Sequence, residues 1–533
     1  MQIKRNKGLK SAIKTGWSYV SPFCYHTPEY LRNLDDDIRQ YEINDLKGFV
    51  LLPVIPGWYR YSGYRQAVIG HAFKIQGYQP LFLANDNVLP ICPGQMSEDT
   101  QKGCTDMCTQ APEELSTHFN IDIEYMSSNI DRELQEYTQI LQETTAPEVI
   151  YENDDLTSFV LSSLRRHFKR HNLDMNNDEH KNAWKDFAVS AMMIKDATES
   201  VLSNYDVKTT IAFEETYIQG GVPLFCTAKE DITGYSIDWG YKSEQLIFGK
   251  TTNRQYLSLF SDEELLENVM STELTSDEIN AVEKTMSERM DGINTKSNYV
   301  AFEGNSIDAE GYDTVVGLFT NLIWDASLEA KEGAYSNPFE WLNTTIEWFS
   351  SQDNKLLVIK THPAETLEGR HGTNQPVADW IYENYESLPE NIIVLEPDAD
   401  VNPYAMIADL DVGIVYNSII GLEMAYEDLP VIVGGDPHYR SLGFTFDADD
   451  EKEYVEYLEQ LPDGFDLEST SMLARRYAHY FFEQKHIPVQ FYKSEGTYTR
   501  TMYPITHTEL RDWPYDTIVQ SMIAGKPVLK IQP

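Results

Sequence analysis

Three residue types that suit nucleotide binding lie close together in the stretch VYNSIIGLEMAYED. Ser418 and Gly421 follow an apolar run, and Glu423 comes five residues after the serine. Because Gly421 occupies the third position after Ser418, the stretch lacks the capping box that would explain a serine at a helix start. A hydroxyl and a glycine there suit a diphosphate, and a carboxylate one turn later suits a ribose diol. We therefore predict a nucleotide site; the alternative is an ordinary helix cap beside a surface glutamate.

The motif KTHP ends a second apolar run and contributes Lys360 and His362. Alternate side chains of a strand share one face, so we expect these two side chains to point the same way. Two potential cations suit a phosphate leaving group, and a histidine can also donate a proton to it. The alternative is a strand-end histidine before the turn-forming Pro363. Glu365 is expected either to orient His362 or to cap the next helix.

Further candidates follow two other apolar runs. Asn321 and Asp325 lie in FTNLIWDAS, and Arg440 lies in GGDPHYRSLGFT. An arginine can bind a phosphate in a bidentate manner, so we predict Arg440 as another ligand of the same nucleotide.

The elements that must position these residues alternate regularly in the carboxyl-terminal half. Continuously apolar segments predict strands buried on both faces at 314–321, 355–362, 391–397, 411–418 and 430–435, with helical patterns between them. Such alternation predicts a doubly wound α/β domain, in which ligands bind at the carboxyl ends of the strands. The candidate residues all lie at those ends.

The amino-terminal half predicts a second domain of the same kind. Strands at 48–55 and 80–86 flank a helical pattern, which indicates a parallel strand–helix–strand unit. Long helices are expected at 156–171 and 182–205, and short strands at 209–213, 222–227 and 243–250. The predicted fold is α/β, with two Rossmann-like doubly wound domains facing across a cleft. We place a basic and polar arm at 1–44, the domains at 45–292 and 293–466, and a helical tail at 467–533.

The chain carries 85 acidic and 42 basic side chains, a net charge of −43 spread over 533 residues. A field of this sign repels nucleic acid, which is not expected as a partner. The simplest interpretation is a protein of a salt-rich cytoplasm, where such repulsion is screened; the alternative is an ordinary acidic protein. The sequence has no run of about 20 apolar residues that would predict a membrane-spanning helix, and its start lacks an apolar signal core.

The amino-terminal arm is clearly basic, and we interpret it as a solvated tail, with contact to an anionic membrane surface as the alternative. The expected location is therefore the cytoplasm, with a peripheral position at the inner membrane face left open. Five cysteines do not predict a disulfide framework. Cys92, Cys104 and Cys108 fall in one expected loop, where reduced thiols are the default and a zinc site completed by His118 is the alternative. We expect neither a metal nor a cofactor.

As a set, these motifs resemble glycosyltransferases of the GT-B type that act in capsule and surface-polysaccharide biosynthesis. The similarity runs through HAFKIQGYQPLFLANDN, LFTNLIWDAS, LLVIKTHPAE and VYNSIIGLEMAYEDLPVIVGGDPHYRSLGFT, and spans roughly residues 45–450. It implies that Ser418 and Glu423 hold the phosphate and ribose of the donor, and that His362 has the role of the family's HP histidine. Lys360 stands where these proteins commonly have arginine, which keeps the charge but loses the bidentate fork.

The same resemblance implies that the amino-terminal domain holds the acceptor. An inverting transferase needs a base there to take the proton of the acceptor hydroxyl, and the candidates are Glu214, Glu215 and His71. The loop GWYRYSGY and the residue after it offer Arg60, Tyr61 and Arg65 near the expected cleft, and aromatic and amphipathic side chains suit a sugar ring.

The functional hypothesis is a hexosyltransferase-like glycosyltransferase that uses a nucleotide-sugar donor. Its acceptor would be a surface glycan or a lipid-linked oligosaccharide, in surface-polysaccharide assembly or in protein N-glycosylation such as that of an S-layer. Three alternatives stay open: a polyol-phosphate transferase that uses a cytidine-diphosphate polyol, a sugar-nucleotide 2-epimerase, and a non-enzymatic scaffold of a glycan assembly complex. The acidic composition suggests a halophilic archaeon as the source.

Overall fold

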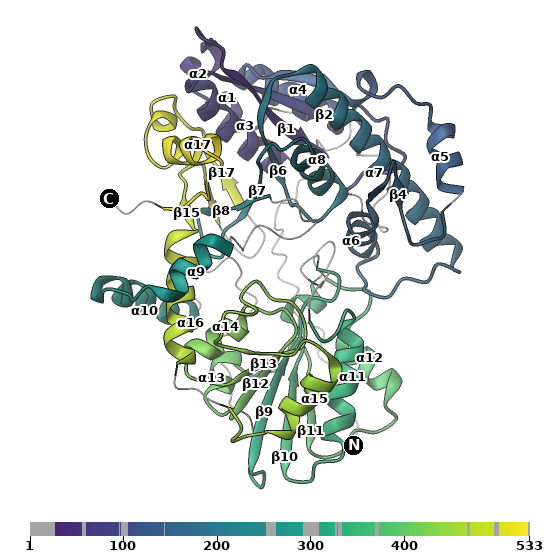
Figure 1. The fold of residues 1–533 in the computed structure, drawn as a ribbon, viewed down its shortest axis with the longest axis vertical. Coiled ribbons are helices and arrows are strands. Elements are labelled where there is room, and N and C mark those ends of the chain that lie inside the picture. Colours follow the sequence, from purple (N-terminus) through teal and green to yellow (C-terminus); the bar gives the residue numbers. More distant parts are fainter. Residues whose placement is uncertain are drawn as a thin grey trace, which may run out of the picture.

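The computed structural model describes residues 27–55, 60–94, 96, 105–142, 144–251, 263–291, 307, 309–325, 328, 333–367, 372–465, 469–494 and 500–530. Two open sheets form two α/β domains, which lie one above the other in Figure 1. Residues 1–26 of the predicted amino-terminal arm lie outside the described residues, as does Cys104, whereas residues 27–44 pack against the core of the amino-terminal domain and are no solvated tail. Much of the predicted boundary between the domains, residues 292–306, lies outside the described residues too.

The sheet of the amino-terminal domain has the order β15-β8-β7-β6-β1-β2-β3. Its parallel strands are β1 (Gly48–Val54), β2 (Tyr78–Ala84), β3 (Asp122–Tyr125), β6 (Val207–Phe213) and β7 (Gly234–Trp239). β8 (Gln245–Lys250) and β15 (Ile487–Pro488) extend the sheet through antiparallel pairing. From β1 the chain first adds strands on one side and then crosses to β6 on the other. The boundary between β1 and β6 is therefore the switch point, where such sheets bind ligands.

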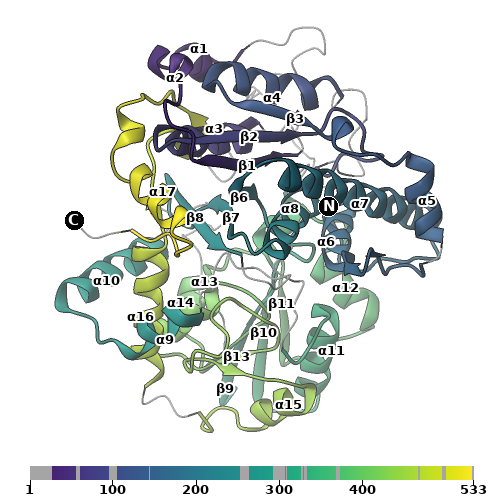
Figure 2. The same cartoon turned by 45° about the horizontal axis from the view of Figure 1, so that its top comes forward.

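Helices cover both faces of this sheet, as the apolar strands require. Along β1, Val50, Leu52 and Val54 pack toward α3 (Arg60–Ile75) and α4 (Thr105–Phe119). Leu51 points the other way, toward α6 (Thr157–Phe168), α7 (Asp178–Asn204) and α8 (Ile218–Lys229). Figure 2 shows these two helical layers above and below β1 and β2. The smaller elements are α1 (Glu29–Arg32), α2 (Asp36–Gln40), η2 (Met126–Ser128), α5 (Leu134–Gln142), β4 (Ile150–Tyr151) and β5 (Asp154–Asp155).

The predicted strand at 222–227 is wrong, because these residues lie within α8. This helix is buried on most sides, so its apolar residues do not follow the one-sided pattern that identifies a surface helix. Gly220 and Gly221 lie in the first turn of this helix. They permit close packing, since a Cβ at Gly220 would collide with the backbone oxygens of Phe213 and Glu214.

The carboxyl-terminal sheet is parallel throughout, in the order β11-β10-β9-β12-β13-β14. Its strands are β9 (Thr314–Phe319), β10 (Lys355–Lys360), β11 (Ile392–Leu395), β12 (Val412–Val415), β13 (Val431–Val433) and β14 (Phe446–Asp447). α11 (Pro338–Phe349), α12 (Val377–Asn384) and α15 (Glu451–Glu459) cover one face; α13 (Pro403–Ile407) and α14 (Ile420–Tyr426) cover the other. The switch point lies between β9 and β12. The prediction of two doubly wound domains in a GT-B arrangement is confirmed.

The carboxyl-terminal tail joins the two domains. α16 (Thr470–Ala478) and the π-helical turn η6 (His479–Gln484) pack against α14, α9 (Glu263–Ser271) and α10 (Ser276–Met290), at the left of Figure 1. The tail then enters the amino-terminal sheet as β15 and continues through β16 (Tyr492–Ser494), β17 (Arg500–Met502) and η7 (Glu509–Arg511). α17 (Tyr515–Ile523) finally packs on α3. Among the described residues, no helix combines the length and apolar character needed to cross a membrane.

Candidate functional site

A hydrogen-bonded chain joins three strand ends at the switch point of the carboxyl-terminal sheet. The backbone N–H of Asn417, after β12, donates to Oδ1 of Asn321, after β9, at 3.1 Å. The backbone N–H of Asp436, after β13, donates to Oδ1 of Asn417 at 2.6 Å. These bonds hold the loops at the edge where a ligand is expected. Asn417 was missed by sequence reasoning, although it directly precedes the serine that was chosen.

Ser418 lies on this edge but does not cap the following helix. β12 ends at Val415 and α14 begins at Ile420, so the residue at the cap position is Ile419. Oγ of Ser418 lies 3.5 Å from the backbone nitrogen of Ile420, at the outer limit of a hydrogen bond. The ordinary cap interpretation therefore explains little of this serine, whose side chain is half-buried.

Packing within the protein explains why position 421, three residues after Ser418, is a glycine. A Cβ at Gly421 would collide with the hydroxyl of Tyr439, which donates to the backbone oxygen of Ser418 at 2.6 Å. Something does come close to this backbone, as the missing side chain suggested, and in this structure it is Tyr439. Gly421 shapes the loop that carries Ser418, and its own space is filled.

The strand that was expected to carry both Lys360 and His362 ends at the lysine. β10 ends at Lys360, and His362 begins the single turn η4 (Pro363–Thr366). Nζ of the buried Lys360 donates to the backbone oxygen of Glu396, beyond β11, at 2.9 Å. His362 instead feels the charge of Asp325, beyond β9. The alternation rule fails because the strand stops before the histidine.

His362 is held as a neutral hydrogen-bonding group. Its Nδ1 accepts from the backbone N–H of Ala364 at 3.1 Å, so the neutral ring carries its proton on Nε2. Burial lowers the pKa of His362 to about 4; Asp325 opposes this shift and Lys360 adds to it. At pH 7 the ring is a donor rather than a cation. A phosphate bound beside it would raise its pKa toward the range useful for proton transfer.

The other domain reaches this edge through the turn between β7 and β8. Burial raises the pKa of Tyr241, and the charge of Asp325 contributes to the same shift. A nearby small pocket is lined by side chains that include Asn321, Phe339, Trp341 and Tyr416. Phe339, Trp341 and Tyr416 are buried, so this pocket belongs to the core beneath the edge of the sheet.

Glu423 is buried in an ion pair that sequence reasoning did not foresee. It is 2% exposed, and its Oε1 accepts from Nε and Nη2 of Arg289 in α10 at 2.9 and 2.6 Å. Tyr404 donates to Oε2 at 3.2 Å. Arg289 also donates to the backbone oxygen of Tyr241 at 3.3 Å. The carboxylate thus lies behind the site and links α14 to the segment before the second domain; a surface glutamate is excluded.

Arg440 contacts groups of its own domain. Nη1 donates to the backbone oxygen of Gly435 at 3.3 Å, and Nη2 donates to the backbone oxygen of Ala448 and to Asp449 at 2.9 and 2.6 Å. These bonds brace the loop after β13 against the end of β14. Since they occupy both terminal nitrogens, we do not carry Arg440 into the proposed ligand set.

The three candidates for the catalytic base in the amino-terminal domain lie in two different places. Glu214 and Glu215 follow β6 at the switch point, where Arg166 donates to Glu214 at 3.3 Å and Ser236 donates to Glu215 at 2.8 Å. His71 lies instead in the core between α3 and the tail, with Nε2 3.2 Å from Nδ1 of His507. Burial lowers the pKa of His71 to about 3. Its position removes His71 as a base for an acceptor.

Of the cysteines placed in the predicted loop, Cys108 lies in a helix instead. Cys92 is half-buried, whereas Cys108 is buried within the helix α4. His118, the fourth ligand that was considered, places Nδ1 2.8 Å from the backbone oxygen of Glu114.

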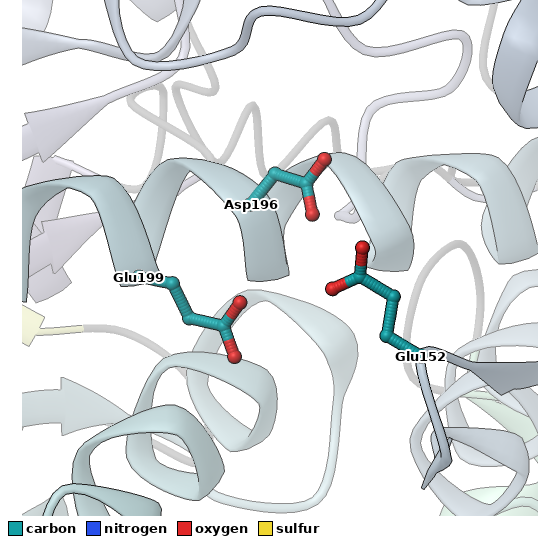
Figure 3. A group of neighbouring side chains, drawn as sticks. All are labelled: Glu152, Asp196 and Glu199. Carbon is teal, nitrogen blue, oxygen red and sulfur yellow. The ribbon is translucent and has the colours of Figure 1, made fainter.

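Within the described part of the chain, one group of three acidic side chains has metal-like spacing, Glu152, Asp196 and Glu199, drawn in Figure 3. Arg132 forms ion pairs with Glu152 and Asp196 at 2.7 and 2.9 Å. Lys195 forms ion pairs with Glu152 and Glu199 at 3.2 and 2.8 Å. The charges are compensated internally, so the cluster is a salt-bridge network on α7.

Residues 330–483 match the family of capsule polysaccharide biosynthesis proteins. The match contains β10 to β14 and so includes Lys360, His362, Asn417 and Ser418. Among solved structures, the chain is similar to the beta Kdo 2,4 transferase KpsC of Thermosulfurimonas dismutans, with 13% identity, 60% of this chain and 88% of that chain covered, and a TM-score of 0.34. It is similar to the UDP-GlcNAc 2-epimerase of Neisseria meningitidis, with 11% identity, 82% and 97% covered, and a TM-score of 0.25. Similarity at this level shows nothing about the fold beyond what the strand order already shows. No curated protein matches the chain.

Proposed function

We propose that this protein is a glycosyltransferase of surface-polysaccharide assembly. It transfers a sugar, in the hexosyltransferase manner, from a nucleotide-sugar donor to a surface-glycan or lipid-linked acceptor. The observation that carries the proposal is the set of joined strand ends at the switch point, beside His362, within the segment that matches capsule polysaccharide biosynthesis proteins. Fold alone would not support it, because Rossmann-like folds host many chemistries.

The donor binds the carboxyl-terminal domain in this proposal. Ser418 and the loop joined by Asn321 and Asn417 hold the diphosphate, and Nε2–H of His362 donates to the leaving phosphate. Lys360 supplies positive charge from β10, since its ammonium makes one hydrogen bond, to Glu396, and no carboxylate lies within salt-bridge distance of it in the described chain. Glu423 contributes indirectly, by holding α14 against Arg289.

The acceptor binds the amino-terminal domain. Its hydroxyl oxygen bonds the anomeric carbon of the donor sugar while the bond from that carbon to the diphosphate oxygen breaks. The nucleotide leaves with the electron pair, and Glu214 takes the hydroxyl proton. Arg166 beside Glu214 favours the charged carboxylate that a base requires. Glu215 is buried, whereas Glu214 is partly exposed, which makes Glu215 the weaker candidate.

The setting remains part of the proposal. We place the reaction in the cytoplasm, where nucleotide sugars are available, with a peripheral position at the membrane if the acceptor is lipid-linked. The basic arm would supply contact with an anionic surface. Capsule-like polysaccharide is favoured over protein glycosylation by the family match.

A thermal-shift panel of nucleoside mono- and diphosphates tests donor binding first. A ligand at a hundred times its Kd stabilises the folded state by about 2.7 kcal/mol, which is a measurable rise in melting temperature. We expect one base to be preferred. If no nucleotide raises the melting temperature, the proposal fails.

A transfer assay then separates the alternatives. A glycosyltransferase releases nucleotide only when an acceptor is present, whereas an epimerase changes the sugar without one. A polyol-phosphate transferase would respond to a cytidine-diphosphate polyol, and a scaffold would respond to neither. His362→Ala should lower the transfer rate more than the affinity for nucleotide, because the histidine acts on the leaving group.

A further inference from the structure

Arg65 lies at the switch point of the amino-terminal sheet. It belongs to the second turn of α3, the helix that follows β1. Its neighbour Gln66 fixes this turn, since Nε2 donates to the backbone oxygens of Pro53 in β1 and Ile211 in β6, both at 2.9 Å. The guanidinium of Arg65 lies over Phe213, the last residue of β6, with Cζ 4.4 Å from the ring centroid. Arg65 thus occupies the position where an open α/β sheet binds ligands.

This guanidinium is buried and has no hydrogen-bond partner among the residues that the structure describes. Arg65 is 0% exposed, and its Nε, Nη1 and Nη2 all lack an acceptor. The group is packed between aromatic rings, because Trp239 at the end of β7 also lies 4.4 Å from Cζ. A buried cation without an acceptor is strongly unfavourable, and such groups are rare in folded proteins unless a ligand satisfies them.

The neighbouring charges do not complete the site. Burial lowers the pKa of Arg65 to about 10, so the side chain stays charged at pH 7. Asp238 and Glu214 oppose that shift from nearby, but neither accepts a hydrogen bond from Arg65. A second cation, Arg500 of β17, lies over the same indole, with Cζ 4.4 Å from the ring of Trp239. Two arginines from opposite ends of the chain therefore converge on one tryptophan.

We infer that Arg65 binds an anionic oxygen group of a substrate, either a carboxylate or a phosphate. The guanidinium at this switch point provides the planar donors that such groups require. The inference rests on the proposed function, since it assigns the anion to a sugar acid or sugar phosphate of the acceptor or to the diphosphate of the donor. Arg65 is covered, so binding requires rotation of a neighbouring side chain, a common change at binding sites.

Ligand-observed titrations on the full chain test this inference with defined probes. Glucuronate and glucose 1-phosphate represent an anionic acceptor, UDP and CDP represent the donor, and glucose is the neutral control. The variant is Arg65→Met, which keeps an apolar stem. The matched control is Arg475→Met, because Arg475 also stacks on a ring, Tyr426 at 4.9 Å, away from both switch points.

We expect the unmutated protein and Arg475→Met to bind at least one anionic probe more tightly than glucose. Arg65→Met should weaken that probe roughly tenfold or more, as the loss of charged hydrogen bonds predicts. Weakening of glucuronate or glucose 1-phosphate assigns the anion to the acceptor, and weakening of the nucleotides assigns it to the donor. The melting temperature of Arg65→Met should stay the same or rise, because an unpaired buried charge is removed.

Two results would overturn the inference. One is anionic probes that bind the unmutated protein no better than glucose. The other is Arg65→Met with unchanged affinities and a lowered melting temperature, which would make Arg65 a structural cation packed between rings. Failure of the proposed function is separate, since absence of nucleotide binding leaves the sugar-acid titrations fully interpretable.

Discussion

Glu423 and Arg289 form a buried ion pair whose two side chains are 2% and 8% exposed. The guanidinium also stacks on Phe482 of η6, with Cζ 4.6 Å from the ring. Through these two contacts, Arg289 connects α10 to α14 and to the tail. Taking two charges out of water is costly, so the pair is tolerated only because Tyr404 and the backbone of Tyr241 satisfy its remaining groups.

Replacing Glu423 with Gln should destabilise the protein by about 3 kcal/mol, because Arg289 would remain buried without a counter-charge. Chemical denaturation measures this as a lower midpoint. The double variant Arg289→Met with Glu423→Leu should recover most of the loss, since neither charge is then left alone. A midpoint that does not move in Glu423→Gln would show that the carboxylate is not paired in solution and would return it to the ligand set.

At the scale of single residues, the sequence predicts which side chains lie at the site better than it predicts which side chains they contact. Asn321, His362 and Ser418 could be chosen because polar side chains after apolar runs must lie at one sheet edge. The ion-pair partner of Glu423 could not be predicted, because Arg289 is 134 positions away and the sequence of its helix α10 has the pattern of an acidic surface helix. The unpaired state of Arg65 likewise exists only after β1, β6 and β7 have come together.

Among the elements, the connection from β10 to α12 has a defined polar link. Glu365 is buried, and its two carboxylate oxygens accept from the backbone N–H of Val377, the first residue of α12, at 3.4 and 3.3 Å. Of the two roles expected for Glu365, helix capping is the one observed. Burial raises its pKa to about 8, an effect that the bond from Val377 opposes.

This pKa makes stability depend on pH in a defined direction. The folded state binds the proton of Glu365 more tightly than the unfolded chain does, so the stabilisation is complete below about pH 4.5 and is lost as the pH rises through about 8. Glu365→Gln keeps an acceptor and removes the titration. The unmutated protein should therefore lose about 1 kcal/mol per pH unit relative to this variant across that window.

Denaturation midpoints of both proteins between pH 5 and 8 provide the check. The control is Glu383→Gln, because Glu383 is an exposed glutamate of α12, the helix whose start Glu365 contacts. A constant difference between Glu365→Gln and the unmutated protein would contradict the assigned burial.

Elements were predictable where one physical rule acted alone. Five of the six strands of the carboxyl-terminal sheet are continuously apolar because helices cover both faces, and these five were predicted; the two-residue β14 was not. The helix α8 was not predicted. It is buried on most sides, so its sequence lacks the amphipathic pattern of a surface helix, and glycines are uncommon within helices. The antiparallel strand β15 is too short to carry any pattern of its own.

At the scale of the whole molecule, net charge is the dominant feature. A charge of −43 repels itself in the folded state when salt is dilute, and the screening length falls to ~3 Å near 1 M salt. We expect the melting temperature to rise steeply from dilute buffer toward molar potassium chloride. A midpoint that is flat or falls up to about 2 M would remove the high-salt interpretation.

The two domains are also held together away from the tail. The backbone N–H of Asn374 donates to the backbone oxygen of Lys169 at 2.8 Å, and Thr373 donates to the same oxygen at 2.9 Å. Together with the Arg289 pair and β15, this contact keeps the carboxyl-terminal switch point beside the amino-terminal domain. The proposed transfer from one domain to the other requires that placement.

The central claim is that a donor nucleotide binds where β9 and β12 diverge. Isothermal titration of Ser418→Ala with the nucleotide selected by the thermal-shift panel tests it most directly, because the hydroxyl has only a marginal internal bond and its removal should leave the melting curve unchanged. His118→Ala in the other domain is the control. The account predicts affinity roughly tenfold weaker in Ser418→Ala, as expected for a lost hydrogen bond to a charged phosphate. Affinity unchanged for every nucleotide that binds the unmutated protein would contradict the proposed site.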